Sequence, residues 1–230
     1  MLEEIKEKVF EANLELQKKK VVLYTWGNAS EIDREQGLVV IKPSGVPYEE
    51  LSPQKMVVVD MTGQVVEGKL RPSVDTPIHL YLYRNFEQIG GVAHTHSSYA
   101  SAWAQANLAI PCLGGTHSDY FYGDVPCTRR LTADEMDQLE TNTGKVIVER
   151  FQDLDYNAIP AVLVAFHGPF TWGKDAYQAV FHSVVLEEVA RIAYFTHGLN
   201  PGIERMPQSL LDRRYARKHG KGAYYGQQAP

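Results

Sequence analysis

Ile89-Gly-Gly-Val-Ala-His-Thr-His96 is the most informative stretch of this 230-residue sequence. Its composition predicts a strand over residues 89–95. Side chains on a strand alternate between its two faces, so His94 and His96 point the same way while Thr95 points to the other face. Two imidazoles on one face at the end of a strand form half of a divalent-metal site. The alternative is that each histidine is a hydrogen-bonded residue at the sheet edge.

A third histidine stands at a comparable place. His167 directly follows the apolar run 161–166, which predicts a buried strand, and ends of strands are where sheet-built sites gather their ligands. A carboxylate would complete a site for zinc or a similar ion, and Asp75 is a candidate. The sequence alone favours a different role for Asp75, as a capping residue beside Thr76-Pro77 at the start of a helix.

The flanking sequence predicts alternating helices and strands. Strands are expected at 21–25, 38–42, 57–60 and 64–66, helices at 2–17, 76–86, 97–106, 132–140, 174–197 and 206–219, and a loop at 168–173. The elements alternate without one doubly wound rhythm, so we expect a single domain, residues 1–230, with a layered α/β or α+β sheet.

Composition excludes several classes of protein. The chain carries 23 Lys and Arg against 28 Asp and Glu, a net charge of −5, and no long basic block, which disfavours nucleic acid and anionic membranes as partners. The longest apolar run is far too short to span a membrane. Two cysteines without a CxxC pair fit a reducing compartment, and the acidic N-terminus does not resemble a signal peptide. We therefore expect a cytoplasmic protein.

A second polar cluster suits an anion. It comprises three segments: Gly27-Asn-Ala-Ser30, Lys42-Pro-Ser-Gly45 and Pro72-Ser73. Small hydroxyls, an amide, a lysine and a glycine are the groups that orient a phosphate monoester. Ordinary turns have the same composition, and none of these segments matches the longer GxxxxGK[ST] phosphate loop. Among the remaining polar groups, Asp119 and the tail tyrosines Tyr224 and Tyr225 are candidate acid/base groups.

Five motifs in one order identify a likeness. They are Lys42-Pro-Ser-Gly45, Pro72-Ser-Val-Asp-Thr-Pro77, His94-Thr-His96, His167-Gly-Pro169 and Ala223-Tyr-Tyr-Gly-Gln227. Together they make the chain resemble the class II aldolase and adducin-head family over essentially its whole length, and most closely its pentulose-phosphate 4-epimerases. The resemblance implies a three-layer α/β/α subunit with a largely antiparallel central sheet. It also implies a homotetramer with active sites between subunits.

The resemblance further implies roles for individual residues. Metal ligands are His94, His96 and His167, with Asp75 near or on the metal, which would be Zn²⁺ or, in its place, Mn²⁺ or another divalent ion. The phosphate-binding positions are Asn28, Lys42, Ser44, Gly45 and Ser73. Asp119 matches one catalytic acid/base, and Tyr225 matches the other, which the family supplies from the neighbouring subunit. Val74 stands where the family usually has a serine, which removes a hydroxyl from the phosphate pocket. Arg214 stands where some relatives have a histidine and receives no role.

The implied reaction is inversion at C4 of a pentulose 5-phosphate, which interconverts L-ribulose 5-phosphate and D-xylulose 5-phosphate. The C4 hydrogen of a 2-ketose is not acidic, so simple deprotonation fails. Transient oxidation would need bound NAD, but no strand-GxGxxG-helix unit exists, since Gly220-Lys-Gly222 has the wrong spacing. Retro-aldol cleavage of C3–C4 and re-addition remains, with a metal stabilising the enediolate as a Lewis acid and the phosphate group tethering glycolaldehyde phosphate.

Two alternatives stay open. One is a sugar-phosphate aldolase of the L-fuculose-1-phosphate type, which shares the three histidines but releases its products. The other is a non-catalytic adducin-like scaffold, which the retained histidines disfavour. Arabinose breakdown and ascorbate breakdown could both use the epimerisation.

Overall fold

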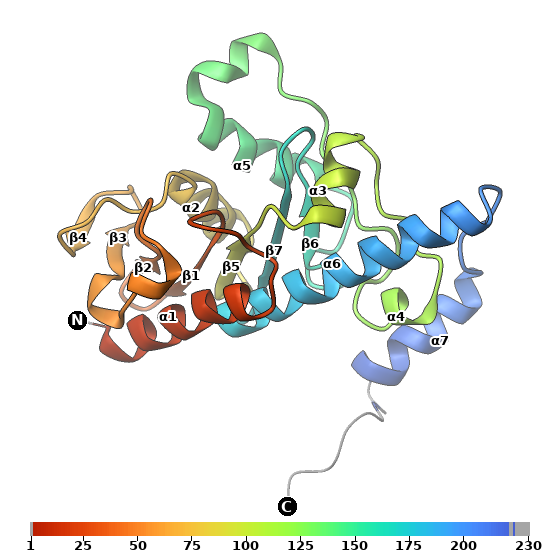
Figure 1. The fold of residues 1–230 in the computed structure, drawn as a ribbon, viewed down its shortest axis with the longest axis horizontal. Helices are drawn as coiled ribbons and strands as arrows, with labels where there is room; N and C mark the ends of the chain where they lie inside the picture. The colour runs from red at the N-terminus through yellow and green to blue at the C-terminus, as the bar shows by residue number, and fades with distance from the viewer. Residues whose placement is uncertain (1, 221–222, 224–230) are drawn as a thin grey trace, which may run out of the picture.

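A seven-stranded sheet forms the centre of the molecule in the computed structural model, which describes residues 2–220 and Ala223 (Figure 1). The strand order is β4-β3-β2-β1-β5-β7-β6, and every neighbouring pair is antiparallel. The strands are β1 (Asn28–Asp33), β2 (Leu38–Ile41), β3 (Val57–Asp60), β4 (Val65–Glu67), β5 (Gly91–His94), β6 (Ala161–Leu163) and β7 (Pro169–Gly173).

The described residues also form seven α-helices and three short 3₁₀ helices, of which α4 and α7 lie apart from the sheet. The α-helices are α1 (Glu3–Lys18), α2 (Thr76–Asn85), α3 (Ser98–Gln105), α4 (Gly115–Ser118), α5 (Leu139–Arg150), α6 (Ala176–Leu199) and α7 (Gln208–His219). The 3₁₀ helices are η1 (Tyr48–Glu50), η2 (Pro53–Lys55) and η3 (Ala133–Gln138).

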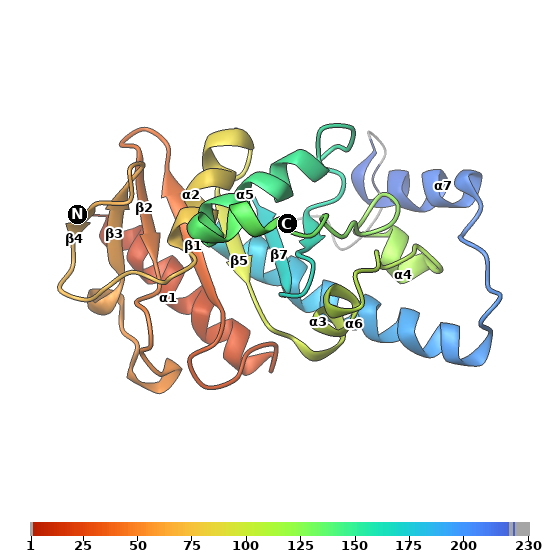
Figure 2. The same cartoon turned by 90° about the horizontal axis from the view of Figure 1, so that it is seen from above.

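The helices cover both faces of the sheet. On one face, residues of α2 and α5 such as Leu82 and Ile147 pack against Val92 and Trp172 of the strands. On the other face, α1 and the first half of α6 pack against alternate residues of the same strands, and α3 joins the second half of α6 beyond β6. Figure 2 shows the sheet between these two groups of helices. The expected three-layer α/β/α arrangement with a largely antiparallel sheet is confirmed.

Two glycines, Gly90 and Gly91, let the start of helix α6 approach strand β5 closely. A Cβ atom built on Gly91 would lie 2.2 Å from the backbone carbonyl of Asp175, the residue that caps the start of α6. Glu31 of β1 also holds the start of α6, because its carboxylate accepts a hydrogen bond of 2.8 Å from the backbone N–H of Ala176. The Gly-Gly pair before Val92 therefore seats the long helix against the strand that carries His94.

Three sequence-based assignments of strands were wrong. Strand β1 was not predicted because Asn28, Ser30 and Glu31 are polar, yet all three are buried and hydrogen-bonded. The segment 168–173, expected to be a loop, contains β7, since a proline can occupy the first position of a strand, where Pro169 stands. The strand expected at 21–25 is absent, because Tyr24 has a left-handed backbone (φ 53°) inside a turn.

The helix expected at 132–140 is in fact two elements. Thr132 and Glu135 form a reciprocal capping box, but the six residues that follow Thr132 form the 3₁₀ helix η3. Helix α5 then continues to Arg150, well beyond the expected end. Across the described part of the chain, no helix is both long and apolar enough to cross a membrane.

Candidate metal and phosphate site

Three imidazoles converge at one end of the central strands. The ligand atoms of His94, His96 and His167 all lie within 4.8 Å of one another, and the Nε2 atoms of His94 and His96 are 2.9 Å apart. His94 is buried, His167 is half-buried and His96 is exposed. The predicted grouping of the three histidines is confirmed, while their role as ligands remains a prediction.

The antiparallel sheet brings these residues together. His94 is the last residue of β5 and pairs with Phe170 of β7, so the turn that carries His167 lies beside the end of β5. The Nδ1–H of His94 donates to the carbonyl of Pro169 at 2.9 Å. This hydrogen bond fixes the tautomer of His94 and leaves its Nε2 lone pair facing the other two rings, as in metal sites with an oriented histidine.

The protonation state of the cluster suits a cation. Desolvation lowers the pKa of His94 to about 3, and the partial loss of water around the imidazoles of His96 and His167 lowers their pKa values too. All three imidazoles are therefore neutral at pH 7, with lone pairs available. Zinc at about 2.0–2.1 Å from each nitrogen would hold adjacent donors roughly 3.3 Å apart, which falls between the 2.9 Å of the His94–His96 pair and the 4.8 Å limit of the whole cluster. The residues present thus fit a divalent ion.

Asp75 lies next to the imidazoles but does not cap its helix. It occupies the N-cap position of α2 without any capping hydrogen bond from its side chain, so the capping role that the sequence favoured is wrong. Its Oδ2 instead accepts a hydrogen bond of 2.7 Å from the Nδ2–H of Asn28. Burial alone would raise the pKa of Asp75, but His94, His79 and the Asn28 hydrogen bond together lower it. An ionised carboxylate therefore faces the neutral histidine cluster.

A cavity of about 410 Å³ joins the histidines to the predicted phosphate-binding residues. Its lining residues are Thr25, Trp26, Gly27, Asn28, Lys42, Pro43, Ser44, Gly45, Ser73, Val74, Asp75, His96 and His167. All five residues expected to bind phosphate are in this wall, together with Asp75 and two of the three histidines. The volume is suited to a small polar ligand.

Strand register explains how segments far apart in sequence share this cavity. Asn28 of β1 pairs directly with His94 of β5. Beyond the end of β2, Pro43 forms a bridge with Pro72, and the backbone N–H of Ser73 donates to the carbonyl of Lys42 at 3.0 Å. The Lys-Pro-Ser-Gly and Pro-Ser segments are thereby held side by side.

Lys42 is the main positive group of the cavity. Its side chain is buried, and among the described residues its Nζ donates to only two groups, the backbone carbonyls of Thr25 and Pro43, at 3.4 Å each. The ammonium also lies 4.9 Å from the centre of the Tyr48 ring. Burial lowers the pKa of Lys42 to about 8. A buried cation served by such long contacts favours an anionic ligand.

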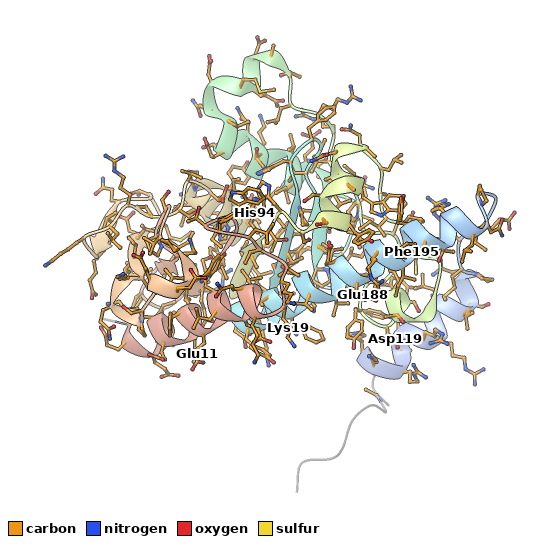
Figure 3. The ribbon with its side chains drawn as sticks, viewed as in Figure 1. Glu11, Lys19, His94, Asp119, Glu188 and Phe195 are labelled. Atoms are coloured by element: carbon orange, nitrogen blue, oxygen red, sulfur yellow. The ribbon has the colours of Figure 1, made fainter. Side chains whose placement is uncertain are left out.

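Asp119 lies elsewhere in the subunit. It follows α4, and its carboxylate contacts Arg217 at 3.2 Å, Lys218 at 3.8 Å and Arg214 at 3.9 Å. Figure 3 shows Asp119 beside α7, away from His94, and Figure 2 agrees that α4 lies apart from β5. Asp119 is thus not part of the cavity wall in the same chain. Tyr225, the other predicted acid/base, lies outside the described residues.

Other histidines have structural surroundings. The Nδ1–H of His182 donates to the carbonyl of Trp172 at 2.7 Å, and the Nε2–H of His117 donates to the carbonyl of Gly123 at 2.8 Å. His79 shares a hydrogen bond of 2.7 Å with Ser30 inside the core. These contacts give His182, His117 and His79 structural roles.

Sequence reasoning missed Trp26 as a wall of the cavity. Its ring centre lies 6.2 Å from that of His96, and half of its surface is exposed. The signal was available, since an aromatic residue directly before Gly27-Asn28 in a polar anion-binding segment is unexpected for an ordinary turn.

Comparisons with known proteins give the family. Residues 7–194 match the model of the Class II Aldolase and Adducin N-terminal domain. The chain is 54% identical over 227 residues to proteins named L-ribulose-5-phosphate 4-epimerase UlaF from Salmonella paratyphi A and from Salmonella typhi; the match spans 98% of this chain and all of each relative. A solved structure named L-fuculose 1-phosphate aldolase superposes with a TM-score of 0.79 at 25% identity, over 93% of this chain and 95% of the aldolase. The chain therefore belongs to the class II aldolase and adducin N-terminal domain family.

Proposed function

We propose that the chain is a metal-dependent epimerase that interconverts L-ribulose 5-phosphate and D-xylulose 5-phosphate at C4. The observation that carries this proposal is that one cavity is lined both by imidazoles of the histidine cluster and by the residues expected to bind phosphate. Identity of 54% to proteins named as this epimerase, over nearly the whole chain, supports the same reaction.

The phosphate end of the substrate belongs at the Lys42 end of the cavity. Lys42 supplies the charge, Ser44 and Ser73 supply hydroxyls, and the exposed Gly45 has a left-handed backbone (φ 68°) that leaves its N–H approachable. Asn28 is held by Ser73 and Asp75, and its buried Oδ1 has no partner among the described residues. That oxygen is placed to accept a hydrogen bond from a substrate hydroxyl.

His94, His96 and His167, with Asp75 beside them, would hold the divalent ion, for which we propose Zn²⁺. Bound there, the ion supplies Lewis-acid stabilisation of negative charge on the ketose oxygens. The chain's own acid/base groups move the proton. One group removes it from the C4 hydroxyl as the C3–C4 bond breaks, the electron pair passes to C3, and an enediolate and glycolaldehyde phosphate form. After the aldehyde turns, C3 attacks its other face and a second group protonates the new C4 oxygen.

For the two acid/base groups we propose Asp119 and Tyr225. Because Asp119 is remote from the histidines of its own chain, it would act in the cavity of a neighbouring subunit. We also propose a homotetramer with active sites between subunits, in which a neighbouring subunit would supply Asp119.

The test is epimer formation by purified protein, run as isolated, after chelation, and after Zn²⁺ or Mn²⁺ is restored. Metal-dependent conversion of L-ribulose 5-phosphate to D-xylulose 5-phosphate is the expected result. Absence of epimer with any metal contradicts the proposal and directs the assay to deoxyketose 1-phosphates, the substrates of the aldolase alternative.

A further inference from the structure

We propose that Trp26 is a retaining wall that keeps the cleaved two-carbon phosphate fragment in the cavity while it turns. This inference rests on the proposed epimerase function and deepens it. An epimerase of the retro-aldol type has a requirement that an aldolase lacks, because its fragment must rotate and re-add before it escapes. Something in the cavity must therefore oppose escape without fixing one orientation of the aldehyde.

The position of Trp26 suits it to oppose escape of the fragment. It lines the same cavity as Lys42 at the phosphate end and His96 at the imidazole end, and its ring centre lies 6.2 Å from the His96 ring. Trp26 is 51% exposed, so about half of the residue is open to solvent rather than packed in the core. The aldehyde carbon of a fragment tethered at Lys42 would move within this region, between the two ends.

The backbone around Trp26 makes this wall rigid. Its N–H donates to the carbonyl of Leu23 at 2.9 Å, and its carbonyl accepts from the hydroxyl of the buried Tyr48 at 2.8 Å. The next residue, Gly27, has a left-handed backbone (φ 76°), and a Cβ there would lie 2.8 Å from the carbonyl of His94. The backbone of Trp26 is therefore held close to the end of β5.

The chemistry of the indole allows it to oppose escape of the fragment without fixing one orientation of the aldehyde. A flat aromatic face packs against the C–H groups of a sugar fragment, but it does not commit the aldehyde oxygen to one direction as a polar side chain would. The fragment can then expose either face of its carbonyl to C3 while its phosphate stays bound. Trp26 would set the ratio of re-addition to release, and would take no part in proton transfer.

The experiment measures that ratio in Trp26→Ala and Trp26→Phe. Each variant is incubated with L-ribulose 5-phosphate, and D-xylulose 5-phosphate and free dihydroxyacetone are quantified together. Leu23→Ala is the matched control, since Leu23 is an exposed residue of the same segment but does not line the cavity. We expect the dihydroxyacetone released per epimerisation to rise roughly three- to tenfold in Trp26→Ala, less in Trp26→Phe, and not in Leu23→Ala.

Metal content and a binding signal separate retention from other effects. Zinc bound per subunit should match the wild type in all three variants, and glycolaldehyde phosphate should change the tryptophan fluorescence of the wild type but not of Trp26→Ala. An unchanged release ratio in both Trp26 variants would overturn the inference, as would a wild-type enzyme that releases fragments as fast as it epimerises. If Trp26→Ala makes no product, the release ratio of Trp26→Phe decides. A wild type without epimerase activity would instead contradict the proposed function.

Discussion

Lys42 is a residue of the cavity whose charge is expected to change within the pH range of ordinary assays. Its pKa is lowered to about 8 by burial, so the free enzyme carries this charge below pH 8 and loses it above. A phosphate monoester becomes a dianion above about pH 6. The charged Lys42 ammonium and the phosphate dianion are therefore both the main forms only between about pH 6 and pH 8.

We therefore expect the affinity for a phosphate monoester such as glycolaldehyde phosphate to be greatest between about pH 6 and pH 8. Above pH 8 the dissociation constant should rise by about tenfold per pH unit, because each binding event must then protonate Lys42. Titration calorimetry across pH 5–10 checks this. Lys42→Met should bind about tenfold more weakly or worse at pH 7 and lose the dependence above pH 8; retention of that dependence in the variant would assign it to another group.

His96→Asn tests the proposed metal site. The substitution removes one of three neutral imidazole donors, so zinc content and epimerase turnover should fall together, by about tenfold or more. Metal is measured by elemental analysis after dialysis. His197→Asn is the matched control, because His197 lies near the end of α6, remote from the cavity wall. A His96→Asn protein with full metal content and full activity would refute the assignment.

Val74 offers a gain-of-function test at the phosphate end. It is 67% exposed and lines the cavity between Ser73 and Asp75, so a hydroxyl could be added there without disturbing the core. Val74→Ser should lower the KM for L-ribulose 5-phosphate about three- to tenfold, through one added hydrogen bond to a charged group, and leave kcat nearly unchanged. Val74→Thr, which keeps the branched shape, separates the hydroxyl from the change in volume. An equal KM in all three proteins would show that the side chain does not reach the phosphate.

At the scale of elements, the sequence predicted the apolar and glycine-bounded segments well and the polar ones poorly. Helix α6 and strand β3 followed from their patterns, because burial of apolar side chains dominates there. Strand β1 did not, since Ser30 and Glu31 are buried through partners on α2 and at the start of α6 that only the folded chain supplies. The cavity was likewise predicted as separate polar segments, and the register that joins Asn28 to His94 could not be read from spacing.

Strand β5 and the start of α6 depend on each other at Gly91. Gly91→Ala places a methyl group 2.2 Å from the Asp175 backbone, and backbone cannot yield as a flexible side chain can. We expect a loss of about 1–3 kcal/mol or more in the free energy of unfolding, measured by urea denaturation. Gly198→Ala is the control, because nothing lies within 4 Å of its Cβ position in α6, and it should be neutral or stabilising by up to about 1 kcal/mol. Equal stabilities of the two variants would show that the strand and helix can separate without cost.

At the scale of the whole molecule, the distance between Asp119 and the histidines of its own chain predicts that inactive variant subunits can restore activity to one another. If each active site combines the histidines of one subunit with Asp119 of a neighbour, His96→Asn and Asp119→Asn subunits should complement each other. Each pure variant should be nearly inactive, while co-expressed subunits in equal amounts should recover about a quarter of wild-type activity, the share of randomly mixed interfaces with both groups intact. No recovery in mixed oligomers, verified by mass spectrometry, would place all of the chemistry within one chain.

The pairing of Asn28, His94 and Phe170 across three neighbouring strands also has a kinetic consequence. These residues are far apart along the chain, so the proposed metal site does not exist until β5 and β7 have come together, and Asn28 joins it only when β1 pairs with β5. Slow, non-local strand pairing must therefore precede tight metal capture during refolding. Metal uptake would therefore report that the sheet is complete, and it should follow the recovery of native tryptophan fluorescence during refolding. The rate of metal release should match the rate of global unfolding of the sheet rather than the rate of motion of any single loop.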